Sequence, residues 1–150
     1  MNRTPDEKLK AASKAYGAGY TCSQAVFCAY AADMGIDQKT ACRIMEGFGC
    51  GVCGTENLCG ALAAACAIIS YHCCDGTPSC EEKRAANYEK IQKAVALFKR
   101  EYGAATCQEV LHGEAPKPFQ CGMKVKDAVL IISQVLQKVD TKPIENQDER

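Results

Sequence analysis

Apolar residues recur at intervals of three and four along most of the chain, a spacing typical of amphipathic helices. The predicted helices cover residues 5–16, 22–32, 37–45, 58–73, 80–102, 106–111 and 122–139. Residues 58–73 carry few polar side chains on any face, so we expect this helix to be central and buried. No two alternating segments joined by a turn predict a hairpin. The pattern therefore predicts an all-α fold, a compact single-domain bundle of about six or seven helices.

Capping residues mark several of the predicted helix starts. Thr4, followed by Pro5 and Glu7, predicts a capping box at the first helix. Asp37 and Ser79 are the expected caps of the helices that follow them.

Residues 47–60, with the sequence GFGCGVCGTENLCG, hold five glycines and three cysteines. We expect this glycine density to exclude a regular element and to let the backbone lie close to another group. The bundle thus carries one glycine- and cysteine-rich loop. Residues 1–140 are expected to form one cysteine-rich helical domain, and residues 141–150 a disordered polar tail.

The charge balance narrows the classes of partner. The chain has 18 Lys and Arg against 18 Asp and Glu, so it offers no basic surface for nucleic acid. The longest nearly apolar stretch, residues 60–69, is about half of the ~20 residues that span a bilayer, so no membrane span is expected. The N-terminal residues show no secretory signal, which predicts a cytoplasmic protein.

Twelve of the 150 residues are cysteine. Permanent disulfides are disfavoured in a reducing cytosol, and buried structural thiols are the plain alternative to metal or redox chemistry. Cys59, Cys66, Cys73 and Cys80 are spaced by seven, but that step climbs roughly 10.5 Å along a helix. Thiolates on one zinc lie at most ~4.6 Å apart, so this stripe cannot form a single site. For Cys66 packing is favoured.

Two other groups of cysteines are stronger candidates. Cys50, Cys53 and Cys59 form a C-x2-C-x5-C loop, in which the first two thiolates can face one metal. The helix predicted to begin near Cys59 is expected to lower the pKa of its thiol. A second pattern is that four cysteines lie at the first turns of different predicted helices, where the helix dipole stabilises a thiolate; these are Cys22, Cys59, Cys107 and Cys121.

The order of short motifs resembles a known family. G-x2-Y-x-C-S-Q-A-V is followed by G-F-G-x-G, C-G-A, T-C-x-E-V-L and a late cysteine before an apolar helix. This order, over about residues 14–138, is similar to that of the C-GCAxxG-C-C family of redox-active proteins. That family is related to the split-Soret cytochromes and has four hallmark cysteines, which match Cys22, Cys59, Cys107 and Cys121.

The resemblance implies that thiolates of this chain can hold an iron–sulfur cluster. Two departures matter: the C-G-A-x-x-G motif ends here in Ala64, and the family's glycine loop carries two added thiols here, Cys50 and Cys53. No C-x-x-C-H occurs, so covalent c-type haem is excluded.

The sequence thus predicts an iron–sulfur redox protein that exchanges electrons with a partner protein or reduces a small-molecule substrate. The expected ligands are Cys22, Cys59, Cys107 and Cys121, then Cys50 and Cys53, with the backbone of Gly49, Gly51 and Gly60 against the cluster. Two alternatives are a Cu(I)-storage thiolate bundle, which the absence of any C-x3-C disfavours, and a metal-free thiol–disulfide oxidoreductase. A homodimer is left open. The sequence does not decide whether the remaining cysteines are metal ligands or packing residues: Cys28, Cys42, Cys66, Cys73, Cys74 and Cys80.

Overall fold

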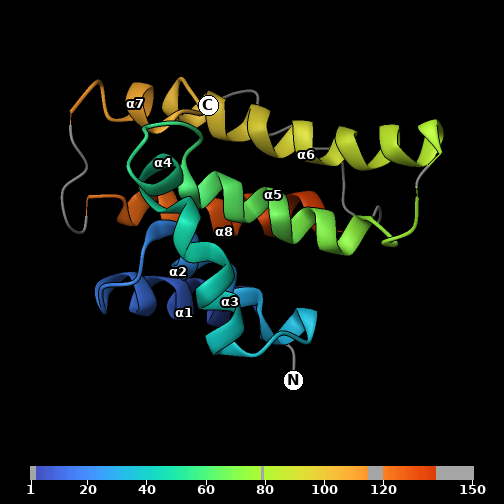
Figure 1. Ribbon diagram of the computed structural model, residues 1–150, viewed down its shortest axis with the longest axis horizontal. Coiled ribbons are helices and arrows are strands. Elements are labelled where there is room, and N and C mark those ends of the chain that lie inside the picture. Colours follow the sequence, from blue (N-terminus) through green and yellow to red (C-terminus); the bar gives the residue numbers. More distant parts are fainter. Residues whose placement is uncertain (1–2, 79, 115–119, 138–150) are drawn as a thin grey trace.

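The computed structural model describes residues 3–78, 80–114 and 120–137 (Figure 1). These residues form helices and no strand, which confirms the predicted all-α class. The elements in order are α1 (Pro5–Gly17), α2 (Cys22–Tyr30), η1 (Ala32–Met34), α3 (Gln38–Met45), η2 (Glu46–Phe48), α4 (Gly49–Cys53), α5 (Gly60–Cys73), α6 (Glu81–Tyr102), α7 (Cys107–Val110) and α8 (Gly122–Leu136).

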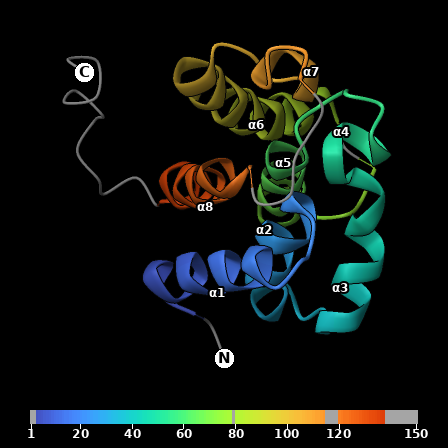
Figure 2. The same ribbon diagram turned by 90° about the vertical axis from the view of Figure 1, so that its left-hand side faces the viewer.

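Helix α5 is the centre of the bundle, as its apolar sequence predicted. It packs against α2, α6 and α8, and α1 covers α2 and α8 from outside. In Figure 1, α6 lies along the top, α5 and α8 through the middle, and α1 and α2 below; Figure 2 shows α3 and α4 flanking one side. The core formed at these contacts includes the fully buried side chains of Val26, Leu62, Ile68, Ile69, Phe98 and Ile132.

The helix starts follow their capping residues. Thr4 and Glu7 form the expected capping box of α1, and the Asp37 carboxylate accepts the backbone N–H of Thr40 at the start of α3. The predicted cap Ser79 lies outside the described residues, and the N-cap position of α6 is occupied by Cys80. The predicted tail at residues 141–150 also lies outside them.

Two predicted elements differ from the structure. The helix predicted over residues 22–32 ends at Tyr30 and continues as the short 3-10 helix η1. The loop predicted over residues 47–60 was expected to hold no regular element, but it begins with the 3-10 helix η2 and the single turn α4. Gly51 and Gly54 adopt positive φ at little cost, and packing holds the other three residues of the turn in the same left-handed region.

No helix in the described part of the chain is both long enough and apolar enough to span a membrane.

Candidate functional site

Five cysteines line one cavity of about 310 Å³ at the end of the bundle where α4 and α7 lie in Figure 1. They come from five separate parts of the chain: Cys22, Cys50, Cys59, Cys107 and Cys121. The four cysteines predicted at helix starts are all among them. The cavity is therefore a meeting point of elements that are distant in sequence.

The helix starts place these thiols. Cys22 and Cys107 are the first residues of α2 and α7, each following a capping threonine. Cys59 and Cys121 occupy the N-cap positions of α5 and α8. Because a helix start presents free N–H groups and a positive dipole end, each of these positions favours a negative ligand or thiolate.

Backbone hydrogen bonds hold the starts of α5 and α7 side by side. Leu58 and Thr106 form an isolated antiparallel bridge. The Cys59 N–H donates to the carbonyl of Ala105 at 2.9 Å, and the Cys107 N–H donates to the carbonyl of Asn57 at 2.6 Å. Cys59 and Cys107 are thus positioned by main chain on two adjacent segments.

The turn α4 is left-handed and forms one wall of the cavity. Five consecutive residues, from Cys50 to Gly54, have positive φ angles between 52° and 82°. A residue other than glycine pays roughly 1–2 kcal/mol in this region, and a β-branched one such as Val52 is rarely found there. Strain of this kind persists where the surrounding structure holds it, which is often at a functional site.

Glycine is required at two positions of the cavity wall. A Cβ on Gly51 would lie 2.6 Å from the Cβ of Cys107 and 2.8 Å from the backbone of Asn57. A Cβ on Gly60 would lie 2.7 Å from the Cys22 sulfur. Both glycines line the cavity, and their missing side chains let the main chain lie close to the thiols.

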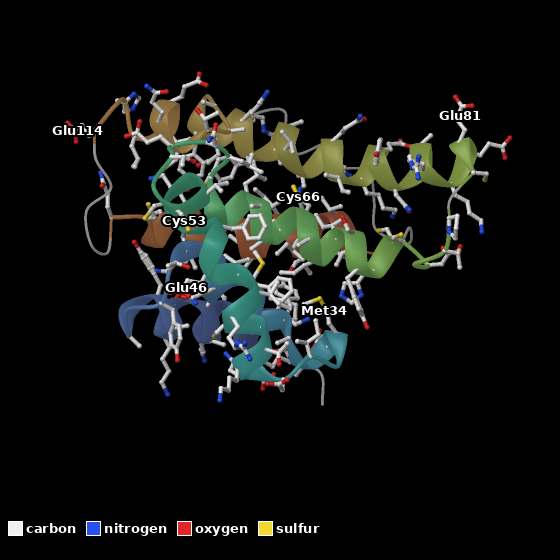
Figure 3. The ribbon with its side chains drawn as sticks, in the orientation of Figure 1. Met34, Glu46, Cys53, Cys66, Glu81 and Glu114 are labelled. Carbon is white, nitrogen blue, oxygen red and sulfur yellow. The ribbon has the colours of Figure 1, made fainter. Side chains whose placement is uncertain are left out.

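Two of the predicted site residues stand apart from the cavity. Gly49 is not among the lining residues. A Cβ on Gly49 would lie 2.7 Å from the Cβ of Thr21, so the glycine makes room for that side chain. Cys53 is exposed and also outside the lining. Figure 3 shows Cys53 at the α4 end of the molecule and Cys66 further along α5. Of the two added loop cysteines, only Cys50 faces the cavity.

Burial raises the pKa values of four cavity thiols and so favours their neutral form; these are Cys50, Cys59, Cys107 and Cys121. Burial raises the pKa of Cys59 to about 12, and the N–H groups of Leu62 and Ala61 lower it by less. The helix start thus lowers the Cys59 pKa as expected, but desolvation outweighs this effect and the net pKa is raised. Burial, followed by the charges of Cys121, Cys22 and Cys50, raises the pKa of Cys107 to about 11.

Among the cavity residues that were not predicted as part of a site, three carry a phenol or an amine: Tyr16, Tyr20 and Lys124. The Tyr16 hydroxyl accepts the backbone N–H of Cys121 at 2.9 Å and also hydrogen-bonds the Cys121 thiol. Lys124 lines the cavity one turn into α8, and its charge lowers the pKa of Cys121 against the larger effect of burial. Tyr20 lines the cavity and is 45% exposed, so the cavity reaches the surface beside it.

The signals for these three residues differ. Tyr20 is the tyrosine of the G-x2-Y-x-C motif and could have been singled out from the sequence. Tyr16 lies on the apolar stripe of α1, where periodicity indicates only packing. Lys124 is one of many lysines, and no pattern distinguishes it.

Five thiols around one cavity are donors of the type that hold iron–sulfur clusters. Among the described residues, no three His, Cys, Asp or Glu side chains are placed to hold one metal ion. Thiolates around a single zinc must lie within ~4.6 Å of one another. A group of several iron and sulfur atoms would span more widely spaced thiols than a lone ion can, and its positive charge would favour their thiolate form.

The other cysteines lie away from this cavity. Cys66 is half-buried and packs against the core from α5, and Cys73, the last residue of that helix, does the same. Cys74 and Cys80 are exposed. Cys28 and Cys42 lie against each other between α2 and α3.

A family described as "Putative redox-active protein (C_GCAxxG_C_C)" matches residues 20–135. The chain belongs to this family. The matched range contains all five cysteines of the cavity and covers most of the bundle. Neither a curated protein nor a solved structure matches the chain.

Membership in the C_GCAxxG_C_C family confirms the resemblance found in the motifs. It also supports the coarser functional statement, that this is a cysteine-rich helical protein of a redox-active family.

Proposed function

We propose that this protein binds an iron–sulfur cluster in the cysteine-lined cavity and uses it to exchange electrons with a partner protein or a small substrate. The observation that carries the proposal is the convergence of five thiols from five chain segments on one cavity. Cys22, Cys59, Cys107 and Cys121 would be the ligands, and Cys50 would add a fifth thiol beside them.

The chain's own residues would bind the group and adjust it. A bound cluster accepts and releases single electrons, at a potential set by charge, hydrogen bonds to its sulfurs and exposure to water. Burial raises the pKa of the Tyr16 hydroxyl, which keeps it protonated and able to donate to the Cys121 sulfur. Val110 and Leu111 line the cavity and exclude water from it. The opening beside Tyr20 is the expected route for electrons or a substrate.

Anaerobic reconstitution with iron and sulfide tests the proposal. We expect a brown protein that contains iron and acid-labile sulfide. Loading with iron should be more complete at mildly alkaline than at mildly acidic pH. The ligand thiols must be deprotonated to bind metal, and the pKa values of Cys59 and Cys107 are raised. A folded, colourless protein without iron, in which every thiol is titratable, would refute the proposal, and preferential binding of many Cu(I) ions would favour metal storage.

A matched pair of variants assigns the site. Cys59→Ser should lose most of the iron, whereas Cys66→Ser, about two turns further along α5 and outside the cavity lining, should keep it. Equal iron content in the two variants would place the metal elsewhere.

The added loop cysteines give a further prediction. We expect the double variant Cys50→Gly, Cys53→Gly to change the iron and sulfide content, the absorbance or the redox potential. Glycine suits both positions because their φ angles are 54° and 52°, so the variant removes the thiols without straining the turn.

The single variants separate the two loop thiols. The effect should follow Cys50→Gly, because Cys50 lines the cavity and Cys53 does not. If iron, sulfide, absorbance and potential are all unchanged in the double variant, neither thiol is a ligand.

A further inference from the structure

A second pair of thiols lies between α2 and α3, apart from the cavity. The sulfur atoms of Cys28 and Cys42 are 3.0 Å apart and share a hydrogen bond. Cys28 is 3% exposed, whereas Cys42 is half-buried at the surface of α3. Neither residue lines the cysteine-lined cavity.

The helices that carry this pair are fixed relative to each other. The Gln24 side chain donates to the carbonyl of Cys42 at 2.9 Å, and the Ser23 hydroxyl donates to the carbonyl of Met45 at 2.7 Å. Both bonds join α2 to α3 close to the thiols. The two sulfurs are thus held in proximity by packing and by side-chain bonds, and a disulfide needs them to approach by only about 1 Å.

We propose that Cys28 and Cys42 form a second, redox-active site, a dithiol that a small hydroperoxide oxidises to a disulfide linking α2 to α3. The two thiols would divide the reaction between them. Cys42 is the thiol that solvent reaches, so it would react first. Cys28 is buried and its pKa is raised to about 12, chiefly by burial and then by its hydrogen bond to Cys42, so it would be the resolving thiol.

The reaction balances in two steps. The Cys42 sulfur attacks the hydroperoxide, whose O–O bond breaks; Cys42 becomes a sulfenic acid and an alcohol, or water from hydrogen peroxide, leaves. The Cys28 sulfur then attacks the Cys42 sulfur and releases water. Two thiols lose two electrons and two protons in total, and the peroxide gains both. A small-molecule dithiol or a dithiol protein would return the pair to its reduced form.

The disulfide would join two elements that reach the cavity. Helix α2 begins with Cys22, and α3 leads through η2 to Cys50. The dithiol itself needs no metal, so it can be tested whether or not a cluster is bound.

Peptide mapping of the full chain after treatment with hydrogen peroxide tests the proposal. Trypsin releases Cys42 on the four-residue peptide Thr40–Arg43, and Cys28 on residues 15–39 together with Cys22. We expect these peptides to be joined, with fragmentation placing the bond at Cys28, and dithiothreitol to separate them. The cross-link should persist in Cys66→Ser, whose thiol is also half-buried, and be lost in Cys28→Ala and Cys42→Ser.

Trapping of the sulfenic acid tests the order of the steps. With dimedone present, labelling of Cys42 should rise on the order of tenfold in Cys28→Ala, because the resolving thiol is missing. In Cys42→Ser, Cys28 should stay open to alkylation after denaturation, a readout that remains if Cys28→Ala does not fold. The absence of the cross-link in peroxide-treated wild type, or equal labelling of Cys42 with and without Cys28, would overturn the proposal.

Discussion

Replacing Gly51 with alanine is expected to destabilise the protein by roughly 3 kcal/mol and to abolish loading of the cavity. The added methyl group would meet the Cβ of Cys107 at 2.6 Å and the backbone of Asn57 at 2.8 Å. Neither neighbour is the end of a flexible side chain, so the turn or α7 must move. The φ angle of +67° adds a backbone penalty of about 1 kcal/mol.

Gly54→Ala is the matched control for this variant. Gly54 lies in the same left-handed turn at φ +82°, but its added Cβ would meet nothing within 4 Å. It should therefore cost only the backbone penalty of about 1 kcal/mol and keep the iron. Chemical unfolding and iron analysis of both variants provide the measurement, and similar losses in the two would show that the turn, and not its contact with Cys107, limits stability.

Cys107→Ser is expected to lower the midpoint of thermal unfolding of the iron-loaded protein by roughly 10 °C. Cys107 is 6% exposed and joins the start of α7 to the cavity. A bound group that ties five chain segments together contributes its binding free energy to folding, and the loss of one ligand removes part of it.

Cys80→Ser is the control for the loss of a thiol as such. Cys80 is exposed at the start of α6, so its replacement should change the midpoint by less than about 2 °C. The difference between the two variants should shrink in the iron-free protein. Equal effects on the loaded protein would mean that Cys107 is not a ligand.

The fold could be predicted from local patterns. The spacing of apolar residues predicted the helices. The capping residues Thr4 and Asp37 predicted where two of them begin. The uniform apolar composition of α5 predicted its central position. The four helix-start cysteines were visible for the same reason, because capping and glycine signals mark where helices begin.

What the sequence could not show depends on contacts between distant segments or on the hand of a turn. Glycine density predicted a tight loop, but Cys50, Val52 and Cys53 are ordinary residues that packing forces to positive φ. The proximity of Cys28 and Cys42 depends on which faces of α2 and α3 meet. The raised pKa of Cys59 also follows from burial by segments far from it, which no local rule about helix ends includes.

The separation of the cavity's residues along the chain has a consequence for biosynthesis. The hydrogen bond between Tyr16 and Cys121 joins residues 105 positions apart. At about 5–20 residues per second, the ribosome synthesises Cys121 roughly 5–20 s after Tyr16. During that interval Cys22, and later Cys59, belong to a nascent chain that lacks the Cys121 side of the cavity. A metal cofactor would thus be assembled only after the whole chain has been synthesised.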